Sequence, residues 1–202
     1  MPIEIKAFSD YIWPFCYIGK GIVDKLKETY DIHETWISYE LHPETPPEGV
    51  QLSERFKGYD VSQMFDHLRR RGKEFGIVFG DLTVLSNSRL SLEASEYARD
   101  RGKHEQFHER IFHAYFTENI DIGDAKKLSE LAAECGLDGI DMMQALKDRR
   151  YKSKLDEAKE EGMMIQLTGV PTFIVNNIIF FNVINIGWFL FIHFTAPAVL
   201  YM

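Results

Sequence analysis

The first part of the chain alternates between the periodicity of a strand and that of a helix. Apolar side chains occupy every second position over residues 3–7, which predicts a β-strand. From Pro14 to Tyr30 the apolar positions recur every three or four residues, and proline is well suited to a first helical turn. Residues 33–41 predict a second strand. Because a helix joins these two strands, we expect a parallel βαβ unit with a right-handed crossover.

A stretch rich in proline and glycine over residues 43–49 ends this unit, and a long helical segment follows. Within that segment, residues 86–88 predict the N-cap of a helix that ends at Gly102. Asp124 predicts the start of another helix, and a further helix is expected from about Gly139. A βαβ unit alone has too small a sheet to be stable, so we interpret the helices as an insertion into an α/β domain.

The rest of the sheet is predicted after the helices. Residues 168–175 read TGVPTFIV, a β-rich run that opens with an X-Pro bond at Pro171, and proline is tolerated at the start of a strand. The local sequence leaves both isomers of this bond open. The predicted organisation is an α/β domain in two parts (1–50 and 156–177), a helical insertion (51–155) and an atypical, uncharged apolar tail (178–202).

Composition narrows the classes of function. The chain has 202 residues and a formal net charge of −8, which argues against nucleic acid as a partner, because that binding depends on clustered Lys and Arg. Its two cysteines, Cys16 and Cys135, lie far apart in the sequence, and no cationic, apolar leader precedes the first strand. We therefore expect a cytoplasmic protein without a disulfide framework.

Residues 104–108 match the zinc-binding pattern H-E-x-x-H, in which two histidines share one face of a helix. A catalytic zinc site requires a third protein ligand. The metzincin continuation is absent, since Ile111 and Ala114 stand where its glycine and third histidine would be. We interpret His104 and His108 as packed helix residues and predict no metal site and no cofactor.

The four residues Trp13-Pro14-Phe15-Cys16 lie between the first predicted strand and the first predicted helix. A Cys-X-X-Cys pair at such a position works because the helix N-terminus favours the thiolate of the first cysteine, and the second cysteine then resolves the mixed disulfide. Here the attacking position carries Trp13, and only the resolving position carries a cysteine.

Four strings in this order resemble the DsbA-like thioredoxin superfamily, specifically its FrnE-like oxidoreductase branch: SDYIWPFCYIGK, LHPETPPEG, SNSRLSLEASEYA and TGVPTFIVN. The resemblance covers residues 3–176. It implies an α/β thioredoxin fold with an inserted all-helical domain, and a cis proline that faces the redox helix. The site residues it implies are Cys16 and Pro171 as catalytic residues, with Trp13, Pro14, Phe15 and Val170 binding the substrate in one groove.

The activity that the resemblance implies is thiol–disulfide exchange on a thiol-containing protein or peptide, or with glutathione. The backbone before the cis proline would pair with an extended substrate segment. An indole cannot form a mixed disulfide, so the first hypothesis is a family member with a degenerate WPFC site and weak or no dithiol turnover, either inactive or using Cys16 as a single thiol.

Two other hypotheses stay open. One is a glutathione-dependent transferase or isomerase of the kappa or hydroxychromene-carboxylate isomerase type, because these proteins share the architecture and activate glutathione with a serine at the helix start. Trp13 offers no such hydroxyl. The other is a non-catalytic peptide-binding or chaperone protein, for which Trp13 and Phe15 would form an apolar platform.

The end of the chain departs from the family pattern. After Glu161 it contains no Asp, Glu, Lys or Arg, and from residue 178 we see neither the expected hairpin strand nor an amphipathic closing helix. Residues 178–199 are long enough to cross a bilayer. Three polar side chains and a proline argue against such an anchor: Asn182, Asn185, His193 and Pro197. Our interpretation is a change of reading frame or splicing near Asn177.

Overall fold

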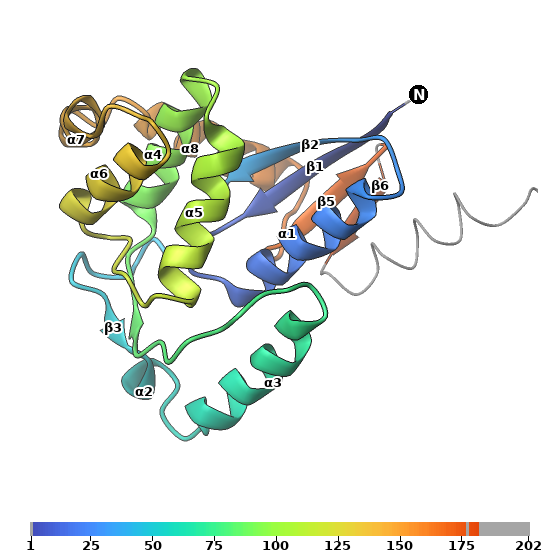
Figure 1. Ribbon diagram of the computed structural model, residues 1–202, viewed down its shortest axis with the longest axis vertical. Helices are drawn as coiled ribbons and strands as arrows, with labels where there is room; N and C mark the ends of the chain where they lie inside the picture. The colour runs from blue at the N-terminus through green and yellow to red at the C-terminus, as the bar shows by residue number, and fades with distance from the viewer. Residues whose placement is uncertain (1, 177, 182–202) are drawn as a thin grey trace, which may run out of the picture.

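The computed structural model describes residues 2–176 and 178–181, and in this part of the chain the central element is a four-stranded sheet (Figure 1). Its strands are β1 (Ile3–Ser9), β2 (Ile32–Ser38), β5 (Thr172–Val175) and β6 (Ile178–Phe181), in the order β2-β1-β5-β6. β1 is parallel to β2 and antiparallel to β5, and β5 is antiparallel to β6. Together with helix α1 (Pro14–Lys27), this arrangement is a thioredoxin fold.

The predicted βαβ unit is confirmed: α1 (Pro14–Lys27) joins β1 to β2, which pair in parallel register from Ile3↔Ile32 to Ser9↔Ser38. Four boundaries differ from the prediction. α1 ends at Lys27 instead of residue 30, and β2 begins at Ile32 instead of residue 33. β1 continues through Ser9, because Ser9 and Ser38 are both buried and continue the ladder, and β2 ends at Ser38 instead of residue 41.

The prediction that the sheet pattern ends before residue 178 is wrong for β6. Ile178–Phe181 pair with Val175–Thr172 as a hairpin. Asn176 adopts a φ of +47° before this strand, a backbone conformation that asparagine tolerates better than most residues. The proposed frame change, the membrane anchor and the tail beyond residue 181 lie outside the described residues. Within the described part, no helix has both the length and the apolar character needed to cross a bilayer.

The segment between β2 and β5 is mostly helical, as predicted. Its helices are α2 (Leu52–Arg55), α3 (Val61–Lys73), α4 (Arg89–Asp100), α5 (His104–Phe116), α6 (Ala125–Glu134), α7 (Gly139–Lys147) and α8 (Lys152–Met164). The segment also contains a small antiparallel sheet of β3 (Val50–Gln51) and β4 (Val84–Leu85), which the all-helical prediction misses because two-residue strands show no periodicity.

Side-chain caps begin the helices near the predicted positions. Asp124 accepts hydrogen bonds from the backbone N–H groups of Lys126 and Lys127, and Asp138 caps α7 in the same way. At α4, Ser88 occupies the N-cap position, but the side chain of Asn87 accepts the bond from the N–H of Arg89, at 3.0 Å.

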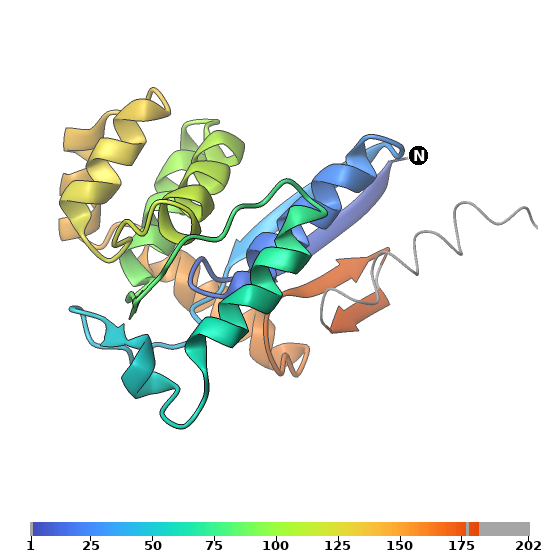
Figure 2. The ribbon, with the colours of Figure 1, turned by 60° about the horizontal axis from the view of Figure 1, so that its bottom comes forward.

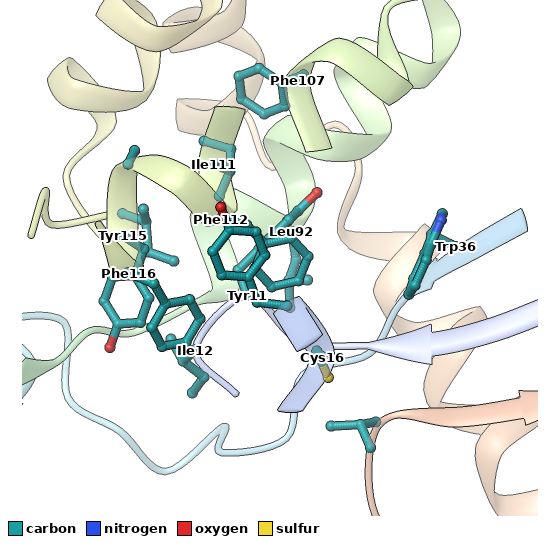
Figure 3. Packing of buried hydrophobic residues seen from close by; sticks show 14 of the residues in the cluster. Tyr11, Ile12, Cys16, Trp36, Leu92, Phe107, Ile111, Phe112, Tyr115 and Phe116 are labelled. Carbon is teal, nitrogen blue, oxygen red and sulfur yellow. The ribbon is translucent and has the colours of Figure 1, made fainter. Parts of the chain in front are cut away.

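An aromatic cluster joins α5 to the thioredoxin part of the molecule (Figure 3). Phe112 stacks on Tyr17 of α1 with ring centroids 5.1 Å apart, and it meets Tyr11 edge-on at 4.9 Å. Phe116 extends the stack at 5.9 Å from Tyr17. Each buried aromatic ring contributes a large apolar area, so this cluster fixes α5 beside the start of α1.

Helix α3 lies alongside α1 (Figures 1 and 2). The close approach depends on Gly21 of α1, since a Cβ atom there would lie 2.7 Å from the Cβ of Phe75 and 3.0 Å from the Cδ1 of Ile77. A side chain at this position would push away the segment that follows α3. Gly21 therefore helps to hold α3 over the face of α1.

Candidate functional site

A cavity of about 940 Å³ lies where α2 and α3 face the start of α1. Its size falls in the range typical of small-molecule sites. We call the part built by the thioredoxin fold the thioredoxin wall: Ile12, Trp13, Pro14, Phe15, Val170 and Pro171. We call the part built by α2 and α3 the helical wall: Leu52, Arg55, Phe56, Met64, Phe65, His67, Leu68 and Arg71. The other lining residues are His42, Leu82, Leu85, Tyr115 and Phe116.

In the thioredoxin wall, Trp13 is the N-cap residue of α1 and Pro14 occupies the first turn. No side chain caps this end of the helix, and its first turn contains no acidic residue. The rings of Trp13 and Phe15 lie 6.0 Å apart, and Phe15 is 41% exposed. The start of α1 therefore presents two aromatic rings where a redox enzyme of this fold would present a thiol.

The second half of this wall comes from the loop before β5. The peptide bond between Val170 and Pro171 is cis, and both residues line the same cavity as Trp13, Pro14 and Phe15. The structure thus brings together five of the six residues that the resemblance implies for the site, although they are more than 150 residues apart in the sequence.

Cys16 is the sixth of these residues, and it does not line the cavity. Its side chain is fully buried, and Figure 3 shows it apart from the cavity residues Ile12, Tyr115 and Phe116. Burial raises the pKa of the Cys16 thiol to about 12, so the reactive thiolate is scarce at neutral pH. The resemblance implies that Cys16 lies in the groove with Trp13 and Pro14, and the structure corrects this placement: α1 turns the side chain of Cys16 into the core.

Cys135 and Cys16 form no disulfide with each other, and both are free thiols in the structure. Cys135 is the C-cap residue of α6, is half-buried and lies outside the cavity lining. Burial also raises the pKa of its thiol.

A buried carboxyl behind the thioredoxin wall was missed by the sequence reasoning. Asp10 is fully buried directly after β1; its Oδ2 accepts a hydrogen bond from the N–H of Leu41 at 2.7 Å, and its Oδ1 accepts one from the N–H of Ile12 at 3.3 Å. Burial raises the pKa of Asp10 to about 7, and these hydrogen bonds oppose the rise. The only sequence signal was a charged residue at the end of a buried strand.

Both histidines of the H-E-x-x-H pattern form hydrogen bonds with other side chains through a ring nitrogen. The hydroxyl of Tyr11 bonds to Nδ1 of His108 at 2.8 Å and to Oγ of Ser95 at 2.7 Å, while Arg99 donates to Nε2 of His104 at 2.8 Å. Burial holds the pKa of His108 well below its ordinary value, so its ring is neutral at pH 7. Within the described residues, no three His, Cys, Asp or Glu side chains are grouped so that they could hold a metal ion.

The helical wall was also missed by the sequence reasoning. Met64, Leu68 and Arg71 follow one another at spacings of four and three, which places them on one face of α3. The pattern over α3 shows an amphipathic helix, but it does not show what the apolar face contacts. Because α3 and the start of α1 are far apart in the sequence, only the fold reveals that they enclose one cavity.

Comparison with known proteins identifies the family. The family model described as "DSBA-like thioredoxin domain" matches residues 4–187. The chain belongs to this family. A curated relative, the uncharacterized protein YwbO of Bacillus subtilis (strain 168), is 32% identical over 185 residues, which is 88% of each chain. The family match and the similarity to YwbO both extend over most of the chain.

Solved structures agree with the thioredoxin fold. The probable DsbA oxidoreductase SCO1869 of Streptomyces coelicolor has a TM-score of 0.81 at 23% identity, over 90% of this chain and 84% of that one. A 2-hydroxychromene-2-carboxylate isomerase has a TM-score of 0.70 at 16% identity, over 89% and 88%. The cytosolic disulfide reductase DsbM of Pseudomonas aeruginosa, solved with GSH, has a TM-score of 0.63 at 17% identity, over 88% of each chain. At these identities the likeness shows the fold.

Proposed function

We propose that this chain is a cytoplasmic, FrnE-like member of the DSBA-like family that binds a thiol-containing ligand in the cavity without dithiol–disulfide exchange. Trp13, Pro14, Phe15, Val170 and Pro171 bind the ligand. Cys16 supports the wall from the core and does not attack the ligand.

One observation carries this proposal: the helix position that faces the Val170–Pro171 loop is a tryptophan, while Cys16 is buried behind it. A dithiol enzyme needs one accessible, activated thiolate and a second thiol within reach. Trp13 cannot supply the first thiolate. Cys16 is shielded from the cavity, and the high pKa of its thiol keeps it protonated at neutral pH.

A second candidate function is glutathione-dependent isomerisation or transfer. It is favoured by the size of the site, since α2, α3 and the start of α1 line a pocket of small-molecule volume. Two proteins of similar fold also support this candidate. One is a 2-hydroxychromene-2-carboxylate isomerase, and the other is a disulfide reductase whose structure was solved with GSH. Isothermal titration with reduced glutathione separates this candidate from a protein that binds only larger thiol ligands.

Insulin reduction with glutathione as the reductant tests the proposal. We expect the wild-type protein and Cys16→Ser to stay at the buffer background, because neither presents an accessible thiolate. Trp13→Cys should give a measurable rate, since it places a thiol at the helix N-terminus, where the thiolate is favoured. Turnover by the wild type that Cys16→Ser abolishes would overturn the proposal.

The double variant Trp13→Cys with Cys16→Ser is the matched control for the insulin reduction expected of Trp13→Cys. It keeps the new thiol but removes the resolving cysteine, so it should accumulate a mixed disulfide and turn over more slowly than Trp13→Cys alone. Cys135→Ser should leave every rate unchanged, because Cys135 lies outside the cavity.

A further inference from the structure

The charge of the cavity is opposite to that of the protein. Among the described residues, the lining includes four side chains that can carry positive charge, namely His42, Arg55, His67 and Arg71, and it includes no Asp or Glu. The whole chain, by contrast, has a formal net charge of −8. The rest of the lining is almost entirely apolar. The cavity therefore combines an apolar interior with cationic groups.

Most of these cationic groups already have neighbours. Nδ1 of His42 lies 3.0 Å from Oε1 of Glu44, and a terminal nitrogen of Arg55 lies 3.6 Å from the same oxygen. Glu44 itself lies outside the lining. Nδ1 of His67 lies 2.9 Å from a terminal nitrogen of Arg70. These contacts leave three of the four groups partly engaged.

Arg71 differs from them and from its neighbour Arg69. Arg69 bonds to Asp66 and Asp81 and to the carbonyl oxygen of Phe79. Across residues 2–176 and 178–181, no side chain or carbonyl oxygen forms a hydrogen bond or ion pair with the guanidinium of Arg71. Arg71 is thus a cavity-lining cation whose hydrogen-bonding capacity is left for solvent or a ligand.

Along α3, the apolar lining residues Phe65 and Leu68 lie deeper than the cationic Arg71. Leu68 is buried, whereas Arg71, one turn further along the same face, is exposed. Phe65 is buried on the same helix. A ligand that enters beside α3 would therefore contact apolar side chains with its inner part and the guanidinium with its outer end.

We propose that the cavity takes a small thiol-containing organic acid with an apolar body, whose carboxylate is bound by Arg71. This inference deepens the proposed function, on which it rests, by naming the chemistry of the ligand. The planar fork of a guanidinium matches a carboxylate with two parallel hydrogen bonds, and Arg55 adds positive charge to the same wall. A cationic ligand of the same size would meet Arg55 and Arg71, and the described residues of the lining offer it no carboxylate.

Three probes of one chain length test the proposal: decanoate, decanol and decylamine, each titrated into the full-length protein below its critical micelle concentration. We expect decanoate to bind more tightly than decanol, and decylamine to bind most weakly. In Arg71→Gln, decanoate should lose about fivefold in affinity, the scale of a partly exposed ion pair, while decanol stays unchanged.

Lys73→Gln is the matched control, because it removes the same charge from the same helix at an exposed residue outside the cavity lining. It should leave decanoate affinity unchanged. An equal loss in Lys73→Gln and Arg71→Gln would show a general charge effect and overturn the proposal.

Two further outcomes separate this proposal from the proposed function. Equal affinity of the wild type for decanol and decanoate would overturn the acid preference and leave ligand binding without dithiol exchange intact. Insulin reduction by the wild type would overturn the proposed function and leave the acid preference intact. A third outcome is that reduced glutathione binds in a way that depends on Arg71 while decanoate does not bind. This result would show that Arg71 binds a carboxylate of the tripeptide, and it would overturn the claim that the ligand has an apolar body.

Discussion

The two walls of the cavity are built differently. The thioredoxin wall stands on the ends of β1 and β5 and on the first turn of α1, and behind it lie the buried groups Asp10 and Cys16. The helical wall stands on the four-residue α2 and on α3, and its cations are exposed. The first wall is made by the fold shared with the family, and Trp13 stands there at the start of α1. The second wall is the one to which we assign ligand selection.

The largest difference between the two walls should be the pH dependence of the unfolding free energy, which comes from Asp10 behind the thioredoxin wall. Asp10 has its pKa raised from 3.8 to about 7 by burial, so the folded state holds this proton more tightly than the unfolded state. Its contribution to stability is therefore complete below pH 4 and is lost as the pH rises through 7. The nominal loss is about 4 kcal/mol of unfolding free energy.

Urea unfolding between pH 4 and 8, compared for the wild type and Asp10→Asn, measures this loss. The difference in unfolding free energy between the two proteins should change by about 4 kcal/mol over this pH range, because Asn cannot ionise. A difference that is flat across this range would show that Asp10 titrates at its ordinary pKa.

Matched truncations should show that the two walls are packed unequally. Ile12→Ala in the thioredoxin wall should lower the unfolding free energy by about 3 kcal/mol, and Leu68→Ala in the helical wall by about 2 kcal/mol. The reason is that Ile12 is only 2% exposed, whereas Leu68 is 8% exposed on a helix that packs mainly against α1. Larger destabilisation by Leu68→Ala, measured by urea unfolding, would reverse this order.

The smallest effect should come from the contact that joins α5 to the strand beside the helical wall. The hydroxyl of Tyr115 donates to the carbonyl oxygen of Val84 at 3.1 Å and accepts a bond from the N–H of Ser86 at 3.3 Å. Tyr115→Phe removes both bonds and keeps the ring, so the unfolding free energy should fall by about 1 kcal/mol. No change in the urea midpoint would show that water replaces the hydroxyl without cost.

The sequence was sufficient to predict the βαβ unit, the helical segment and five of the residues that meet in the cavity. Periodicity gives the elements, and the resemblance relates Trp13 to Pro171 across a long separation. The sequence left open whether Cys16 is a packed core residue or a reactive thiol, because a residue's side of a helix depends on how that helix is rotated against the sheet. Nor could it assign Arg71, since three consecutive arginines look alike until the fold pairs Arg69 with Asp66 and Asp81.

The most direct test of the central claim, that the cavity is closed to Cys16, is the intact mass of Cys135→Ser after incubation with oxidised glutathione at neutral pH. This variant leaves Cys16 as the single thiol. We expect the native protein to keep its unmodified mass, and the same protein in urea to form the mixed disulfide. A mixed disulfide on Cys16 in the native protein would contradict the claim.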